Sequence, residues 1–247
     1  MGMLEIRNVD KVYHTRRKPP VHAVRALDMD IRSGEIVALL GSSGCGKTST
    51  LRMIAGFESV SSGSIALAQR PIHELPPAKR RVAMAFEGYS LYPPLTVREN
   101  IAFALKAQQL SRSEIAQRVD SIARLVEIED ILDSHPRALS GGQQQRVSLA
   151  RALVRDADLY LLDEPMGQLE PQLRAVLRGR IKGLLAERGM TAIFVTHDQT
   201  EASALASVWS WVTKIAVMPR SASSPLMRPR STARSCGSNC PIGSSSR

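Results

Sequence analysis

The chain carries the sequence Gly41-Ser42-Ser43-Gly44-Cys45-Gly46-Lys47-Thr48 directly after a short apolar run, residues 36–40. This is the pattern G-x-x-x-x-G-K-T, and residues 49–56 behind it are typical of a helix. Glycines let such a turn curl so that backbone N–H groups point inward at phosphate oxygens, and the start of the helix adds further donors. An ordinary glycine turn is the alternative, but it leaves the Lys-Thr pair without a reason. The stretch therefore predicts a loop that binds a nucleoside triphosphate, with Lys47 on the β- and γ-phosphates and Thr48 on Mg²⁺.

Length and composition are those of a globular α/β protein. A chain of 247 residues with 43% hydrophobic residues can form one large domain, or one core with an inserted subdomain. No apolar run approaches the ~18 residues that span a bilayer, and acids interrupt any signal-like start. Three cysteines make no disulfide framework, which fits a reducing compartment. The net charge of +10 is not in itself a nucleic-acid signal, because residues 219–247 hold five arginines and no acid, which leaves +5 for residues 1–218.

Hydrophobic periodicity predicts a sheet covered by helices, with a helical insertion. Strands are expected at 4–13, 24–31, 36–40, 64–67, 82–86, 159–162 and 192–195. From about residue 96 to 154 the period is helical, and 172–188 is a long amphipathic segment between two strands. A strand–helix–strand succession favours a parallel sheet. We therefore expect a core made of residues 1–86 and 157–218, with an inserted helical subdomain at 87–156.

Two adjacent acids, Asp163 and Glu164, end one of the expected buried strands. A phosphate-binding loop needs a partner carboxylate to hold Mg²⁺, and Asp163 is placed for that role. Glu164 is the candidate general base that orients and deprotonates the attacking water. Solvated acids at a strand end are common in α/β proteins, so the pair gains its weight from the loop at 41–48.

A second glycine-containing turn, Leu139-Ser140-Gly141-Gly142-Gln143, precedes a helix shortly before the acidic strand. A serine followed by two glycines at a helix start makes another anion site rich in N–H groups. On this segment and on the order of motifs over residues 1–206, the chain resembles the nucleotide-binding subunits of ATP-binding cassette (ABC) transporters. The resemblance implies an α/β fold: a P-loop NTPase (RecA-like) core with a mostly parallel sheet, an N-terminal antiparallel β part and an inserted α-helical subdomain.

The resemblance also implies a head-to-tail dimer with a second copy or a paralogue, in which two ATP molecules are sandwiched. Ser140 and Gly142 of one subunit would contact the γ-phosphate held by the loop of the other. Tyr13 matches the aromatic position that stacks on adenine, although on its own it is more simply a strand tyrosine. His197 matches the switch histidine at the γ-phosphate. The resemblance places nucleotide contacts on Tyr13, Gly41, Ser42, Ser43, Gly44, Cys45, Gly46, Lys47, Thr48, Ser49, Glu87, Ser140, Gly141, Gly142 and Gln143, Mg²⁺ contacts on Thr48, Asp163 and Glu87, and catalytic roles on Glu164, His197 and Lys47.

Two positions depart from the family pattern. Glu87 stands where the family has glutamine, which adds negative charge near the triphosphate. Our hypothesis is that Glu87 keeps the role of coordinating the metal or a water. Glu170 replaces the usual aspartate of the loop that crosses the dimer, residues 166–170, which is a milder change.

The segments Tyr89–Pro93, 96–101 and 196–202 are similar to importer subunits of the maltose and glycerol-phosphate type. This resemblance implies an ATPase that is peripheral to the cytoplasmic face of the cell membrane. Its expected partners are permease subunits, which dock on residues 88–100, and indirectly an extracytoplasmic solute-binding protein; no nucleic acid is expected. Sugars or sugar-like solutes are the expected cargo, although related importers of polyamines, iron and sulfate share much of this pattern.

The chain ends in a segment of different character, residues 219–247, which is rich in Ser, Arg and Pro and includes Cys236 and Cys240. Such a polar segment buries too little surface to order itself, so we expect a disordered or aberrant tail. Importers of this class carry a further β-rich C-terminal domain, so the tail fits a truncated or out-of-frame coding end.

Two other functions remain open from the sequence. One is a soluble ABC ATPase that acts on nucleic acid or ribosomes, although such proteins tend to carry two cassettes or a long coiled coil. The other is a truncated remnant that binds nucleotide without turnover, against which the presence of Asp163, Glu164 and His197 argues.

Overall fold

The computed structural model describes residues 2–14, 16, 19–86, 88–198 and 200, together with the backbone of 213–217. Glu87 lies outside the described residues, as do the tail at 219–247 and its two cysteines. Among the residues described, no helix has both the length and the apolar character needed to cross a bilayer.

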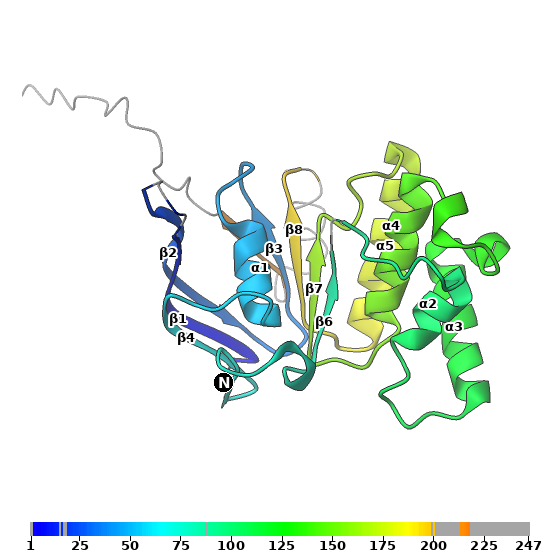
Figure 1. Cartoon of the computed structure of the whole chain (residues 1–247), viewed down its shortest axis with the longest axis horizontal. Helices are drawn as coiled ribbons and strands as arrows, with labels where there is room; N and C mark the ends of the chain where they lie inside the picture. The colour runs from blue at the N-terminus through cyan, green and yellow to red at the C-terminus, as the bar shows by residue number, and fades with distance from the viewer. Residues whose placement is uncertain are drawn as a thin grey trace, which may run out of the picture.

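A parallel sheet forms the centre of the molecule (Figure 1). Its strands, in spatial order, are β6 (Val82–Ala85), β7 (Leu159–Asp163), β8 (Ala192–Thr196), β3 (Ile36–Leu40) and β9 (Thr213–Val217). The strands β7 and β8 are buried along their whole length, which is why each reads as a continuous apolar run in the sequence. The mostly parallel sheet predicted from the sequence is confirmed. The edge strand β9 was not predicted, and it pairs with β3 from Ile36–Thr213 to Leu40–Val217.

An antiparallel sheet covers one side of this core. Its order is β2 (Val21–Ile31), β1 (Leu4–Tyr13), β4 (Ser62–Leu67) and β5 (Arg70–Pro71). The predicted strand at 24–31 begins earlier, because Val21 pairs with Tyr13 at the end of β1. The predicted N-terminal antiparallel part is therefore confirmed, and only the two-residue β5 was missed.

The helices divide between the two faces of the parallel sheet. They are α1 (Lys47–Ala55), α2 (Val97–Phe103), α3 (Arg112–Val126), α4 (Gly141–Leu153) and α5 (Pro171–Glu187). Strand β7 shows the division, since Leu159 and Leu161 pack into the cluster that contains α1 and the antiparallel sheet. Tyr160 and Leu162 point the other way, into the cluster formed with α2 to α5.

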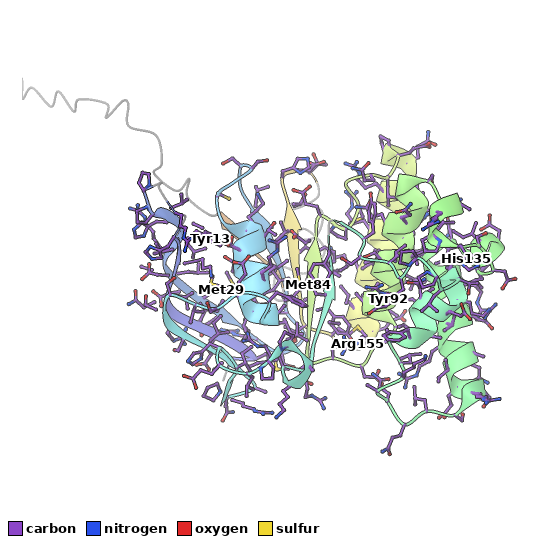
Figure 2. The ribbon with its side chains drawn as sticks, viewed as in Figure 1. Tyr13, Met29, Met84, Tyr92, His135 and Arg155 are labelled. Carbon is purple, nitrogen blue, oxygen red and sulfur yellow. The ribbon has the colours of Figure 1, made fainter. Side chains whose placement is uncertain are left out.

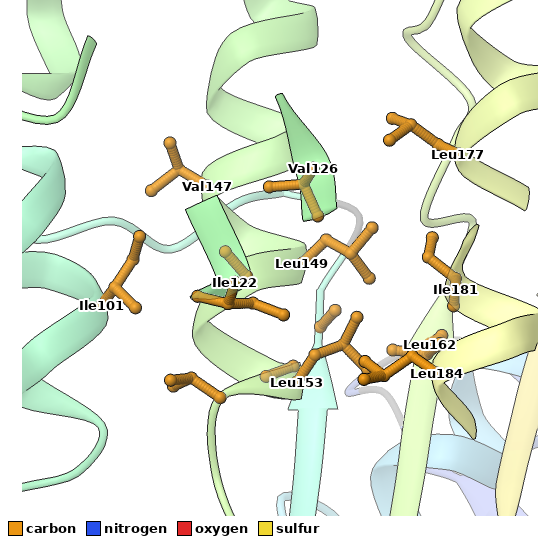
Figure 3. Close-up of a cluster of buried hydrophobic side chains, with 14 of the residues drawn as sticks. Ile101, Ile122, Val126, Val147, Leu149, Leu153, Leu162, Leu177, Ile181 and Leu184 are labelled. Carbon is orange, nitrogen blue, oxygen red and sulfur yellow. The ribbon is translucent and has the colours of Figure 1, made fainter. Parts of the chain in front are cut away.

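The second cluster is the larger apolar core of the helical part (Figure 3). Side chains from α2, α3 and α4, such as Ile101, Val126 and Val147, meet Leu177 and Ile181 of α5 there. Capping boxes fix where three of these helices begin, with the cap residues Thr96, Ser111 and Ser140. The sequence segment 96–154 therefore has the helical character predicted for it, and its packing on the sheet fixes the position of α4.

Candidate functional site

The loop at 41–46 lies between the end of β3 and the start of α1, as its pattern predicts. The Lys47 side chain is buried and folds back over the loop, where Nζ donates to the carbonyl oxygens of Gly41 at 2.6 Å and Ser42 at 3.0 Å. At the turn into the helix, Thr50 donates to the Gly46 carbonyl through its backbone N–H and its hydroxyl, both at 2.9 Å. An ammonium group thus lies within a curled loop at a helix N-terminus, which is suited to binding phosphate.

Two glycines of this loop have backbone angles that favour glycine, but only one of them lies close to a neighbouring strand. Gly44 has a φ of +80° and Gly46 a φ of +101°. A Cβ on Gly46 would lie 2.4 Å from the Ala23 carbonyl oxygen of β2, whereas one on Gly44 would meet nothing within 4 Å. The loop is therefore pressed against β2 at Gly46.

We expect Gly46→Ala to destabilise the protein much more than Gly44→Ala does. Both changes place alanine in the left-handed region, at a cost of about 1–2 kcal/mol. Only Gly46→Ala adds the clash with the backbone of β2, so its total loss should reach at least about 3 kcal/mol. Urea unfolding followed by far-UV circular dichroism measures both losses, and equal losses would show that the contact with β2 is not tight.

The acids at the end of β7 lie beside this loop. The Thr48 hydroxyl donates to Asp163 Oδ1 at 3.2 Å, and Asp163 is almost fully buried. Asp163 is itself the last strand residue, because it pairs with Val195 of β8. A hydroxyl and a carboxylate oxygen at this separation, next to a phosphate-binding loop, are a donor set that fits Mg²⁺.

Glu164 is held in an unusual backbone conformation with a φ of 45°, and its N–H donates to the Val195 carbonyl at 3.1 Å. Its Oε1 lies 3.0 Å from His197 Nδ1, which follows β8. Strand pairing therefore brings together an acid and a histidine that are 33 residues apart. A non-glycine residue in this region indicates local strain, of the kind often found at functional sites.

One cavity of about 570 Å³ brings together half of the predicted site residues. Its lining consists of Tyr13, Val21, Ala23, Ser43, Gly44, Gly46, Lys47, Thr48, Ser49, Glu164 and His197. Tyr13, beside α1 in Figure 2, marks the side of the cavity near the antiparallel sheet. The cavity thus extends from a tyrosine ring, past the loop, to the Glu164–His197 pair.

The second glycine turn lies elsewhere. Ser140 and Gly141 are exposed at the start of α4, and no residue of 139–143 is among those that line the cavity in the described structure. Ser140 caps the helix by accepting from the Gln143 N–H at 3.3 Å, and its own N–H donates to Gln143 Oε1 at 2.9 Å. The turn therefore presents a helix N-terminus to the outside of this chain.

Gln145 is a residue of the site that the sequence analysis missed. It is buried, and its side chain donates to the Glu164 carbonyl at 2.8 Å and accepts from the Gln168 N–H at 2.8 Å. Gln145 therefore links α4 to the backbone of Glu164 and to the loop at 166–170. A glutamine on the buried face of an amphipathic helix was the one available signal.

The ABC transporter family matches residues 24–167 of the chain. The chain is 45% identical over 202 residues to the uncharacterized ABC transporter ATP-binding protein YurJ of Bacillus subtilis. This match covers 82% of this chain and 54% of that protein. It is 46% identical to the sn-glycerol-3-phosphate import ATP-binding protein UgpC 1 of Rhizobium johnstonii, covering 83% and 54% of the two. Against the sulfoquinovosyl glycerol transport ATP-binding protein SmoE of Agrobacterium fabrum the identity is 44%, covering 83% and 56%. The chain thus spans about half the length of these relatives.

Among solved structures, the chain is similar to the dimeric bacterial ABC transporter cassette MJ0796, with a TM-score of 0.77 and 30% identity. The match covers 81% of this chain and 90% of that one. A second structure of MJ0796, in a dimeric post-hydrolysis state with ADP and Pi, has a TM-score of 0.75. The fold predicted from the sequence is confirmed by these matches, and the chain belongs to the ABC transporter family.

Proposed function

We propose that this chain binds and hydrolyses ATP and thereby powers a membrane importer for a sugar or a sugar-like solute. The observation that carries the proposal is the single cavity in which the loop at 41–48 meets the Glu164–His197 pair, with Asp163 hydrogen-bonded to Thr48. The printed functions of UgpC 1 and SmoE, import of sn-glycerol-3-phosphate and transport of sulfoquinovosyl glycerol, support the solute class.

The proposed roles follow the geometry of the cavity. Lys47 and the loop N–H groups bind the phosphates. Thr48 and Asp163 would hold Mg²⁺, which when bound would supply positive charge to the phosphate oxygens. Glu164 accepts a proton from the attacking water, and His197 keeps the Glu164 carboxylate oriented. Glu87 stays a proposed ligand of the metal or of a water.

We also propose that two copies, or this chain and a paralogue, close head to tail. The start of α4 is exposed and lies away from the cavity of its own chain, so it is free to complete the cavity of a partner. The dimeric state of the two MJ0796 structures supports the formation of a dimer. We propose a division into a core of 1–86 and 157–218 and a helical insertion of 87–156. With this division, the core of each subunit contributes the cavity, and the insertion contributes the turn at 139–143.

A complementation experiment tests turnover and the dimer together. Lys47→Ala removes the phosphate-binding ammonium from the loop. Ser140→Arg blocks the second glycine turn, residues 139–143, which we call the signature turn. Each variant alone should therefore hydrolyse almost no ATP. In a 1:1 mixture, heterodimers hold one site built from the intact loop of one chain and the intact turn of the other. We expect recovery of up to about a quarter of the parent rate, because half of random dimers are mixed and each has one complete site. Phosphate release measures it, and a mixture as inactive as its components would contradict the shared site.

We propose that permease subunits dock on a groove between the sheet and the helical part. The groove has a volume of about 400 Å³ and includes Phe57, Phe86, Tyr92, Phe103, Arg151 and Arg155 among its lining residues. Phe57, Tyr92 and Phe103 are each 41% to 54% exposed, which is unusual for large apolar side chains and typical of a docking surface. Of the predicted surface at 88–100, Tyr92 is the residue that lines this groove, where it lies near Arg155 (Figure 2).

Arg151 connects this groove to the helix of the signature turn. Its guanidinium lies 5.1 Å from the centre of the Tyr92 ring and donates to the Ser90 carbonyl at 2.7 Å. Burial lowers the pKa of Arg151. Arg151 belongs to α4, and α4 begins at the signature turn. A permease that contacts Tyr92 would therefore act on α4 through the contact of Arg151 with the Tyr92 ring. Aromatic side chains and arginines, which line this groove, are enriched at protein–protein interfaces and so support a protein partner.

A further inference from the structure

A hydrogen-bonded cluster around Glu58 lies behind the tyrosine of the nucleotide cavity. Glu58 is in the loop that follows α1, and its side chain is only 16% exposed. The Tyr13 hydroxyl donates to Glu58 Oε2. Lys11 Nζ lies 3.8 Å from the same oxygen, and Arg52 Nη1 lies 3.5 Å from Oε1. The carboxylate thus joins β1 to α1.

The same tyrosine is tied to the phosphate-binding helix. Its hydroxyl lies 2.9 Å from the Ser49 hydroxyl, one residue after Thr48. Lys11 Nζ lies 4.9 Å from the centre of the Tyr13 ring and donates to the Ser59 carbonyl at 2.7 Å. Because Lys11 occupies one face of the ring, a base that stacks on Tyr13 uses the opposite face.

We propose that Glu58 is a positioning residue for nucleotide binding, which holds the Tyr13 ring in a preformed orientation relative to the loop at 41–48. The inference rests on the proposed binding of ATP in this cavity, with its base stacked on the Tyr13 ring as the family resemblance implies. A tyrosine whose hydroxyl is fixed at two points loses little side-chain freedom when a base stacks on it, so the base binds more tightly. Burial, and next the hydrogen bond to Glu58, raise the pKa of Tyr13, so the phenol keeps the proton that it donates.

The test compares a ligand that has a base with one that lacks it. We would titrate ATP and inorganic triphosphate, without Mg²⁺, into the parent protein, Tyr13→Phe, Glu58→Ala and the double variant by calorimetry. Each single variant should raise the dissociation constant for ATP about three- to tenfold, the range that corresponds to the net contribution of one ordinary hydrogen bond. Triphosphate should bind as it does to the parent. The double variant should lose no more than the worse single variant, because both changes break the same contact.

Control variants separate positioning from support of the fold. Glu127→Gln changes a half-exposed carboxylate that is paired with Arg180 at 2.9 Å, and this variant should bind both ligands as the parent does. Glu58→Gln, which keeps the shape and one acceptor oxygen, should bind ATP more tightly than Glu58→Ala does. Equally weakened binding of ATP and triphosphate would overturn the inference, since Glu58 would then only stabilise α1. Additive losses of affinity in the double variant would also overturn it. Binding of ATP by Glu58→Ala that is as tight as that of the parent would do the same. A parent protein that binds neither ligand would instead contradict the proposed function.

Discussion

Glu164→Gln is expected to lower kcat for ATP hydrolysis by about 10²- to 10⁴-fold, the usual contribution of a positioned general base. The amide is nearly isosteric with the carboxylate, so it can keep its place 3.0 Å from His197 Nδ1. It has no basic oxygen to accept a proton from water, so the loss should fall on the chemical step. The affinity for ATP should change little, because the phosphates are bound by the loop at 41–48 and not by this side chain.

The measurements for this variant are single-turnover phosphate release and calorimetric binding of ATP. Glu187→Gln, at the exposed end of α5, makes the same chemical change away from the cavity and should retain the parent rate. If Glu164→Gln kept kcat within about threefold of the parent, the general-base role would have to pass to another group, since a loss that small is below what removal of such a base produces.

The fold was predictable where burial leaves a repeating mark on the sequence. Strands β7 and β8 are apolar up to their last residues, Asp163 and Thr196, because both their faces are covered. Three of the helices begin at capping residues, such as Ser140 for α4. Two of the four edge strands in the described structure, β5 and β9, could not be predicted. The pair Arg70–Pro71 is too short to show a period, and 213–217 becomes a strand through its pairing with β3, a partner more than 170 residues away.

The candidate site was predictable where a motif fixes backbone geometry, and less so where distant side chains meet. The glycine pattern at 41–48 places Lys47 and Thr48 without further information, because the turn and the helix start are local. The contact of Tyr13 with Glu58 joins residues 45 apart, and that of Gln145 with Glu164 joins residues 19 apart. A carboxylate after a helix and a glutamine inside one resemble ordinary surface residues until the fold shows what each faces.

Lys47→Ala is expected to raise the dissociation constant for ATP at least about 100-fold, which corresponds to about 2.7 kcal/mol of lost binding energy. Among the described residues that line the cavity, Lys47 is the one lysine or arginine, so its ammonium supplies the positive charge there. Charge-assisted hydrogen bonds to phosphate are the strongest contacts that such a loop makes. Calorimetry with ATP measures the loss, and Lys79→Ala, which removes an exposed lysine elsewhere, should bind as the parent does.

The same variant should fold as stably as the parent when no nucleotide is present. The Lys47 ammonium is buried, 6% exposed, and its hydrogen bonds are to the carbonyl oxygens of Gly41 and Ser42 and, weakly, to Cys45 Sγ. Desolvation of the charge offsets much of what those carbonyls contribute, so its removal should change the free energy of unfolding by no more than about 1 kcal/mol. Weak binding combined with an unchanged urea midpoint would identify Lys47 as a binding group. A large drop in the midpoint would show that Lys47 supports the fold of the loop, and the affinity loss would then report a collapsed loop and not a missing contact to phosphate.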